Sequence, residues 1–93
     1  MSLHAVVWRY TDDTTLIEQA RAAHGAYLKD LFAKGVLREA GPLQDGTGGL
    51  LVFDVADQAE LQPLLENDPY TTQGVIVDTQ IFPWKVVLGS LAA

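Results

Sequence analysis

The chain contains no cysteine, and that absence removes several kinds of chemistry at once. Without a thiol among its 93 residues, it forms no disulfide, has no thiolate nucleophile and binds no metal through sulfur. Basic residues are also scarce, because six Lys and Arg stand against twelve Asp and Glu, for a net charge of −6. An acidic chain is poorly suited to nucleic acid or to an anionic membrane surface, so we expect neither as a partner.

Long hydrophobic runs are missing as well. No segment approaches the roughly 20 apolar residues of a membrane-spanning helix, and the N-terminus lacks the basic region and apolar run of a signal peptide. We therefore expect a cytoplasmic protein. Hydrophobic residues still make up 48% of the chain, which suffices for one core, so we expect residues 1–93 to form a single domain.

Hydrophobic periodicity predicts alternating strands and helices. Clusters of β-branched and aromatic residues predict strands at 3–10, 36–43, 50–55 and 75–81, with an extension past Pro83 to Leu88. Helical spacing predicts helices at 15–34 and 57–67 and a short helical turn at 69–73. The order βαββαβ favours an α+β fold of the ferredoxin-like type, a four-stranded antiparallel sheet with both helices on one face.

Local signals set the ends of these elements. Thr15 and Glu18 have the spacing of a capping box at the start of the first helix, and Gly35 is placed to end it in a left-handed conformation. The pair Gly41-Pro42 indicates that the second strand lies at a sheet edge. Pro63 falls inside the second helix, where nothing in the sequence explains it.

The strands are apolar on both faces, although two helices cover only one face of a sheet. In the first strand the alternating sets are Leu3, Ala5, Val7 and Val6, Trp8, Tyr10. A half-solvated antiparallel sheet would carry polar residues at every second position. We therefore expect a second copy of the chain to cover the free face, in a homodimer or a higher homo-oligomer, and the tail at 86–93 to reach across to the partner.

His24 interrupts the apolar stripe of the first helix, at a position where leucine would be typical. With a rise of ~1.5 Å per residue, two antiparallel helices bring Asp68 to about the height of His24. A carboxylate bonded to one imidazole nitrogen fixes the tautomer and leaves the other nitrogen free as a base. His24 and Asp68 are therefore the predicted catalytic pair.

Three neighbours are predicted to contact the substrate. Arg21 is placed to hold an anionic oxygen, and Tyr27 and Tyr70 offer hydroxyls on a partly apolar wall. Simpler interpretations remain open. A backbone carbonyl often satisfies a histidine on an apolar face, Asp68 before Pro69 is a good N-cap, and an arginine at a rim is often solvated.

No metal or cofactor is expected. His4 lies near the start of the first strand, away from the level of His24, and no ligand spacing such as HxxxH occurs. The glycines at 46, 48 and 49 lack the strand-to-helix context of a phosphate loop and indicate a hairpin turn.

Several short motifs, taken in order, resemble the YciI-like (YCII-related) family: Arg21-x-x-His24, Ala40-Gly41-Pro42, Asp68-Pro69-Tyr70 and Ile81-x-Pro83-Trp84. The resemblance runs from the first strand to about Lys85. It implies a dimeric α+β barrel whose site is formed by the family's His and Asp, which fall on His24 and Asp68. It also implies chemistry like that of a related dehydrochlorinase, in which a base removes a proton and chloride leaves.

We therefore expect a small enzyme of the lyase or isomerase type that needs no cofactor and acts on an aromatic or lactone-like small molecule. In this interpretation His24 is the general base or acid and Asp68 orients it. The alternative is a ligand-binding or accessory domain of the same fold that keeps the pocket but performs no chemistry.

Overall fold

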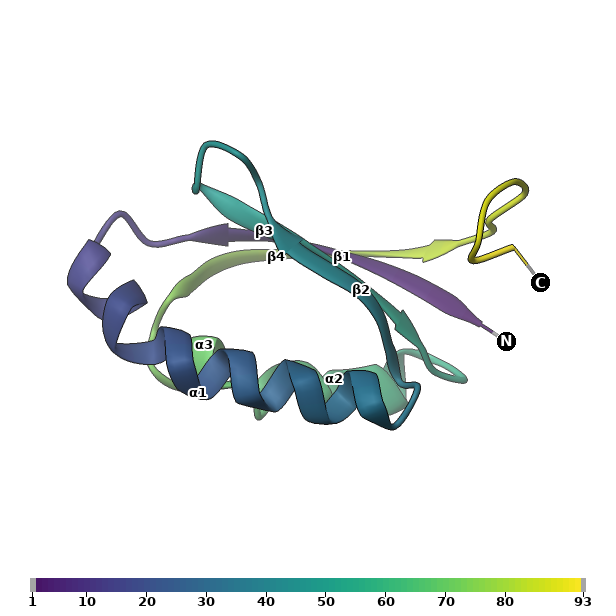
Figure 1. Ribbon diagram of the computed structural model, residues 1–93, viewed down its shortest axis with the longest axis horizontal. Helices are drawn as coiled ribbons and strands as arrows, with labels where there is room; N and C mark the ends of the chain where they lie inside the picture. Colours follow the sequence, from purple (N-terminus) through teal and green to yellow (C-terminus); the bar gives the residue numbers. More distant parts are fainter. Residues whose placement is uncertain (1, 93) are drawn as a thin grey trace.

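The computed structural model describes residues 2–92 and arranges them in two layers, a sheet with helices packed beneath it (Figure 1). The strands are β1 (Leu3–Tyr10), β2 (Leu37–Pro42), β3 (Gly48–Asp54) and β4 (Ile76–Trp84). The helices are α1 (Thr14–Ala33), α2 (Gln58–Glu66) and α3 (Pro69–Thr72). The sheet order is β2-β3-β1-β4 with antiparallel neighbours throughout, which confirms the predicted ferredoxin-like α+β fold.

The core lies between the sheet and the helices. Strand alternation turns Val6 and Trp8 of β1 and Phe53 of β3 toward the helices, where all three are almost fully buried. They pack against Ala20, Leu31, Leu61, Leu65 and Tyr70 from the helical layer.

No helix within residues 2–92 covers the opposite face of the sheet (Figure 1). Register places Ala5, Val52 and Phe82 side by side on this face, and Val7 beside Leu50. Leu50, Phe82 and Trp84 are exposed by 45%, 51% and 46%. We call this surface, formed by Ala5, Val7, Leu50, Val52, Phe82 and Trp84, the open face. Its apolar character was predicted from the strand alternation.

The first helix begins earlier than predicted, and the proposed capping box of Thr15 and Glu18 is wrong. Asp13 is the N-cap, and its Oδ1 accepts hydrogen bonds from the amides of Thr15 and Leu16 at 3.1 and 3.3 Å. A carboxylate also interacts favourably with the helix dipole, so Asp13 is a better cap than a threonine. Gly35 ends α1 at φ 77°, as predicted.

Within residues 2–92 no helix is both long and apolar enough to cross a membrane.

Prolines lie at both sheet edges. Pro42 ends the edge strand β2, as predicted, and Pro83 lies inside the other edge strand, β4, opposite His4. The predicted continuation of the last strand to Leu88 is wrong, because β4 ends at Trp84. Pro63 lies on the exposed side of α2, where water can bond the carbonyl that its missing N–H leaves free.

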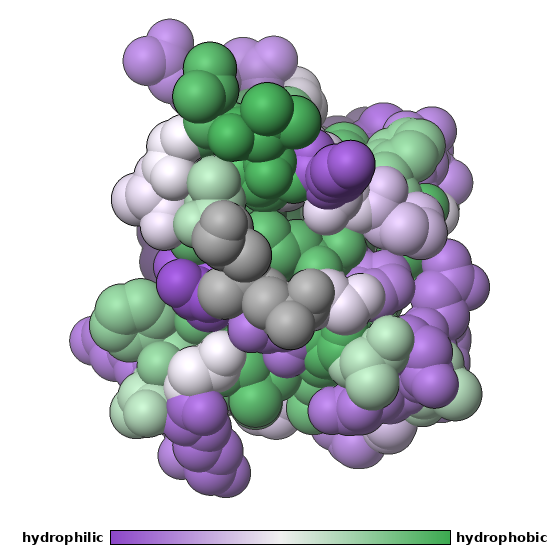
Figure 2. Space-filling model, turned by 90° about the vertical axis from the view of Figure 1, so that its right-hand side faces the viewer, coloured by the Kyte–Doolittle hydropathy of each residue, from purple (hydrophilic) through white to green (hydrophobic). Residues whose placement is uncertain are grey.

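The chain after β4 projects from the body at the end of the molecule where the two termini lie (Figure 1). Val87 and Leu88 in this tail are exposed by 73% and 89%. Viewed from that end, hydrophobic residues gather along the upper edge, on the side that the helices leave open (Figure 2). The last residue of the predicted tail, at position 93, lies outside the described residues.

Candidate active site

A cavity of about 740 Å³ opens between α1 and the β2–β3 hairpin. Ile17, Leu28 and Leu51 give it apolar walls. The side chains that bear chemistry in its lining are Tyr10, Glu18, Arg21, His24, Asp45 and Tyr70. A concave site with mostly apolar walls and a few convergent polar groups is typical of small-molecule binding.

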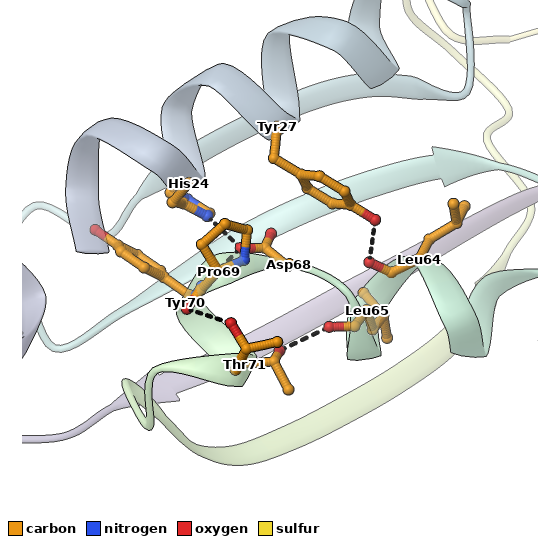
Figure 3. Close-up of polar contacts among 9 residues, drawn as sticks. His24, Tyr27, Leu64, Leu65, Asp68, Pro69, Tyr70 and Thr71 are labelled. Atoms are coloured by element: carbon orange, nitrogen blue, oxygen red, sulfur yellow. Dashed lines mark hydrogen bonds and ion pairs between the residues drawn. The ribbon is translucent and has the colours of Figure 1, made fainter.

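His24 lines this cavity and contacts Asp68, which is not itself part of the lining; the helix geometry predicted this contact. Nδ1 of His24 and Oδ1 of Asp68 lie 2.8 Å apart (Figure 3). The Asp68 side chain is 1% exposed and that of His24 is 14% exposed. Oδ1 of Asp68 also accepts a hydrogen bond from the Tyr70 amide at 2.9 Å, which makes Asp68 the N-cap of α3. Pairing and capping therefore coexist in one carboxylate.

This contact determines which nitrogen of His24 is available. An ionised carboxylate only accepts hydrogen bonds, so Nδ1 carries the proton and Nε2 holds the lone pair. Nε2 has no hydrogen-bond partner among residues 2–92, and the ring lines the cavity. A proton taken up by Nε2 produces an imidazolium beside a buried carboxylate, and buried charges are stable only when paired. In this arrangement Nε2 of His24 can accept a proton on the cavity side of the ring.

Tyr70 supports the imidazole from its face. The two rings are stacked, with centroids 3.6 Å apart and planes 2° apart. The rings of Tyr10 and Tyr70 meet edge to face, with centroids 5.4 Å apart and planes at 78°. These three rings form a continuous aromatic row from β1 through α3 to α1.

Tyr10 is a cavity residue that the sequence analysis missed, because its place after Val6 and Trp8 made it look like core. Burial, followed by the neighbouring Tyr70 and Asp68, raises the pKa of Tyr10 to about 12. The phenol therefore stays protonated near neutral pH and can donate to a ligand. Tyr10 ends the row of apolar side chains on its face of β1, and unlike Trp8 it carries a hydroxyl. That polar group at the end of the row could have indicated a cavity residue.

Arg21 lies at the rim of the cavity. Its guanidinium donates a hydrogen bond to Glu18 at 2.9 Å, and both side chains are largely exposed. The pKa of Arg21 is raised above its ordinary value, first by a hydrogen bond to the Tyr70 hydroxyl and then by the charge of Glu18. The position fits both sequence interpretations, a solvated rim residue and a contact for a ligand oxygen.

Tyr27 does not line the cavity. Its hydroxyl instead donates a 2.7 Å hydrogen bond to the backbone carbonyl of Leu64 (Figure 3). His4 also lies apart from the cavity, buried on β1 with no partner for its Nδ1 within residues 2–92. Among those residues no group of three side chains is arranged to hold a metal ion.

The β2–β3 hairpin forms the outer wall of the cavity. Its residues from Ala40 to Gly46 line the cavity. Asp45 accepts hydrogen bonds from the amide and hydroxyl of Thr47 at 3.0 and 2.7 Å, and these bonds lower the pKa of Asp45. The turn signal Asp45-Gly46 predicted the hairpin.

Comparison with known proteins adds family and fold relationships. The family model of the YCII-related domain matches residues 3–85. A search of curated proteins gave no significant match. Among solved structures, 5-chloro-2-hydroxyhydroquinone dehydrochlorinase of Burkholderia phenoliruptrix AC1100, in complex with 2,5-dihydroxybenzoquinone, is similar at 27% identity and a TM-score of 0.79. The match covers 89% of this chain and 93% of that one.

Two further structures share the fold at lower identity. Muconolactone isomerase is 18% identical with a TM-score of 0.71, over 100% of this chain and 97% of its own. A putative antibiotic biosynthesis monooxygenase of Bacteroides thetaiotaomicron VPI-5482 is 9% identical with a TM-score of 0.65, over 99% and 94%. The architecture is therefore shared by proteins named for different reactions.

Proposed function

This chain belongs to the YCII-related family, and on that basis we propose that it is an enzyme of the lyase or isomerase type, acting without a cofactor by proton transfer at His24. The observation that carries the proposal is the 2.8 Å contact between the buried Asp68 carboxylate and Nδ1 of His24, whose ring lines a cavity. The dehydrochlorinase at 27% identity supports the reaction class.

In the proposed mechanism Nε2 of His24 removes a proton from the substrate. Asp68 holds the ring in the required tautomer and stabilises the imidazolium that forms. The electrons of the broken bond then expel a leaving group from the substrate or move along it, and His24 returns the proton to solvent or to another substrate atom. The first outcome is an elimination and the second an isomerisation.

The substrate class follows from the cavity and the relative together. The dehydrochlorinase was solved with 2,5-dihydroxybenzoquinone, a flat ring that carries oxygen atoms. Aromatic rings and apolar side chains line the cavity here, with the Tyr10 hydroxyl and the Arg21 guanidinium as donors. We infer a small oxygen-bearing ring, aromatic or lactone-like, whose oxygen atoms contact Arg21 and Tyr10.

We further propose that a second copy of the chain covers the open face. Phe82 and Trp84 are about half exposed there beside other apolar residues. An apolar sheet face larger than a few hundred Å² is uncommon on a monomer. A two-fold homodimer would bury the same surface on both copies.

The proposal is tested with 5-chloro-2-hydroxyhydroquinone under argon, with chloride release as the readout. We expect turnover by the wild-type chain and a loss of 100-fold or more in His24→Gln and in Asp68→Asn. Thr72→Val, on the exposed side of α3 and outside the cavity, is the matched control and should retain activity.

Binding is measured in parallel by thermal shift with 2,5-dihydroxybenzoquinone and with muconolactone, because a ligand of the folded state raises the unfolding temperature. Full activity in His24→Gln would overturn the proposed mechanism. Stabilisation of wild-type and His24→Gln chains alike, without turnover of any bound compound, would favour the non-catalytic binding domain.

A further inference from the structure

Tyr27 contacts the segment that carries Asp68, one helical turn along α1 from His24. Residues three apart on a helix share a face, so both side chains point toward the connection between α2 and α3 (Figure 3). His24 bonds the Asp68 side chain at 2.8 Å, and the Tyr27 hydroxyl bonds the Leu64 carbonyl at 2.7 Å. Helix α1 therefore holds this connection at two points, four residues apart.

The Leu64 carbonyl is free for Tyr27 because α2 ends just after it. In a continued helix the amide of Asp68 would bond this carbonyl, but the last turn tightens at the C-cap Asn67, which has φ −89° and ψ −5°. The Asp68 amide turns to the Leu65 carbonyl instead, at 3.4 Å. The last carbonyls of a helix lack partners within the helix, and Tyr27 supplies the missing donor.

The neighbouring carbonyls are satisfied from within the segment itself. The Pro63 carbonyl accepts from the Asn67 amide at 3.0 Å, and the Leu65 carbonyl also accepts from the Thr71 hydroxyl at 2.7 Å. Of these three carbonyls, at Pro63, Leu64 and Leu65, only that of Leu64 is bonded by a side chain of α1. This bond therefore fixes the position of the end of α2 relative to α1, the helix that carries His24.

We propose that Tyr27 is a positioning residue for the His24–Asp68 pair, an inference that rests on the proposed function. Oδ1 of Asp68 must meet two donors at once, Nδ1 of His24 at 2.8 Å and the Tyr70 amide at 2.9 Å. Hydrogen bonds weaken steeply with misalignment, so a shift of about 1 Å in the segment breaks one of the two. The Tyr27 bond prevents that shift. Its hydroxyl bonds the backbone carbonyl of Leu64, whereas the sequence analysis expected it to contact the substrate.

The charge state of Tyr27 suits this role. Burial, followed by the carboxylates of Asp68 and Asp30, raises its pKa above the ordinary value for tyrosine. The phenol therefore keeps its proton throughout the pH range in which an imidazole acts as a base, and the link to Leu64 persists there.

The test is a ligand-free measurement on Tyr27→Phe, which removes one hydroxyl group. In ¹⁵N-labelled protein, NMR reports the tautomer of His24 and the rate at which its Nδ1 proton exchanges with water. We expect a slowly exchanging Nδ1 proton in the wild-type chain, and exchange at least threefold faster with a mixture of tautomers in Tyr27→Phe. The Tyr70 amide, which donates to the same oxygen, should also exchange faster.

Thr72→Val is the matched control, since it removes a hydroxyl that bonds the Pro69 carbonyl at 3.4 Å within α3 and leaves α1 untouched. It should keep the wild-type signals of His24. Wild-type signals in Tyr27→Phe as well would overturn the inference. Loss of the folded state in Tyr27→Phe, measured by urea unfolding, would assign the residue to general stability and overturn it too.

Asp68→Asn distinguishes this failure from failure of the proposed function. If Asp68→Asn alters the His24 tautomer and Tyr27→Phe does not, the pair exists and only the role of Tyr27 is wrong. If neither variant alters it, the His24–Asp68 pair is absent in solution, and both proposals fall.

Discussion

The imidazole of His24 lies flat against the phenol ring of Tyr70, with 3.6 Å between centroids. Tyr70 comes two residues after Asp68, so one turn of α3 supplies both the carboxylate at the edge of the imidazole and the surface against its face. Tyr70→Phe keeps that surface and loses only the hydroxyl, so we expect a loss of about 1 kcal/mol or less in the free energy of unfolding.

Tyr70→Leu removes the ring and leaves space in the core, so a cost of about 2 kcal/mol or more is expected. Activity should fall much further in Tyr70→Leu than in Tyr70→Phe. Urea unfolding and turnover of the same two variants check this. Equal loss of activity in both would mean that the hydroxyl, and not the stacked surface, is what matters.

Removing His24 should destabilise the chain, although leucine suits the apolar stripe of α1. His24→Leu leaves the Asp68 carboxylate, 1% exposed, without its charged or polarised partner. Breaking a buried pair from one side costs about 3 kcal/mol. The double variant His24→Leu/Asp68→Asn should recover part of this cost, because no charge is then left buried. A double-mutant cycle by urea unfolding measures the coupling, and additive effects would contradict it.

Two adjacent glycines of β3 should differ in their tolerance of alanine. A Cβ at Gly48 would meet the backbone carbonyl of Trp8, which cannot yield, whereas a Cβ at Gly49 would lie 2.5 Å from the Tyr10 hydroxyl, the end of a side chain. Gly48→Ala should therefore cost more stability. Gly49→Ala should be rescued in stability by Tyr10→Phe, which removes the clashing atom, while Gly48→Ala should not. Thermal unfolding of the four variants decides this.

Stability should fall at alkaline pH partly through Tyr10. Burial, more than any neighbouring charge, raises its pKa from 10.0 to about 12. The contribution is fully present below pH 10 and is lost as the pH rises toward 12, because the unfolded chain releases this proton first. The free energy of unfolding of Tyr10→Phe should therefore decline less over that range. An identical decline in both proteins would contradict the burial of this phenol.

The proposed dimer predicts an unfolding midpoint that rises with protein concentration. Phe82→Ser, on the open face, should lower the mass measured by light scattering toward that of a monomer. Phe32→Ser, at a 64% exposed position of α1, is the matched control and should leave the mass unchanged. A wild-type chain that is monomeric at micromolar concentration would refute the dimer.

The sequence predicted the element order, the sheet and the meeting of His24 with Asp68, because these depend on regular geometry. Strand alternation and the helical rise per residue are constant along an element. The heights of His24 and Asp68 along the helix axes could therefore be compared, although the two residues are 44 positions apart. The role of Tyr27 could not be found in this way, since it depends on the residue at which α2 ends.

Other features failed for reasons of local competition or long-range shape. Asp13 and Thr15 are both residue types that cap helices. The structure uses Asp13, whose carboxylate is negatively charged, and residue spacing alone does not show this advantage. Tyr10 and the hairpin residues from Ala40 to Gly46 belong to the cavity because separate elements meet there. Their meeting depends on the long-range shape of the sheet, which no local residue pattern records.

Pro42 and Pro83 have a consequence for the behaviour of the chain at high concentration. They lie on β2 and β4, the two outermost strands, and proline is one of the residues with which natural sheets discourage pairing at an edge. Addition of further strands to either side, the route to fibrils, is therefore hindered. The molecule can present a broad apolar surface to one partner and still resist open-ended aggregation.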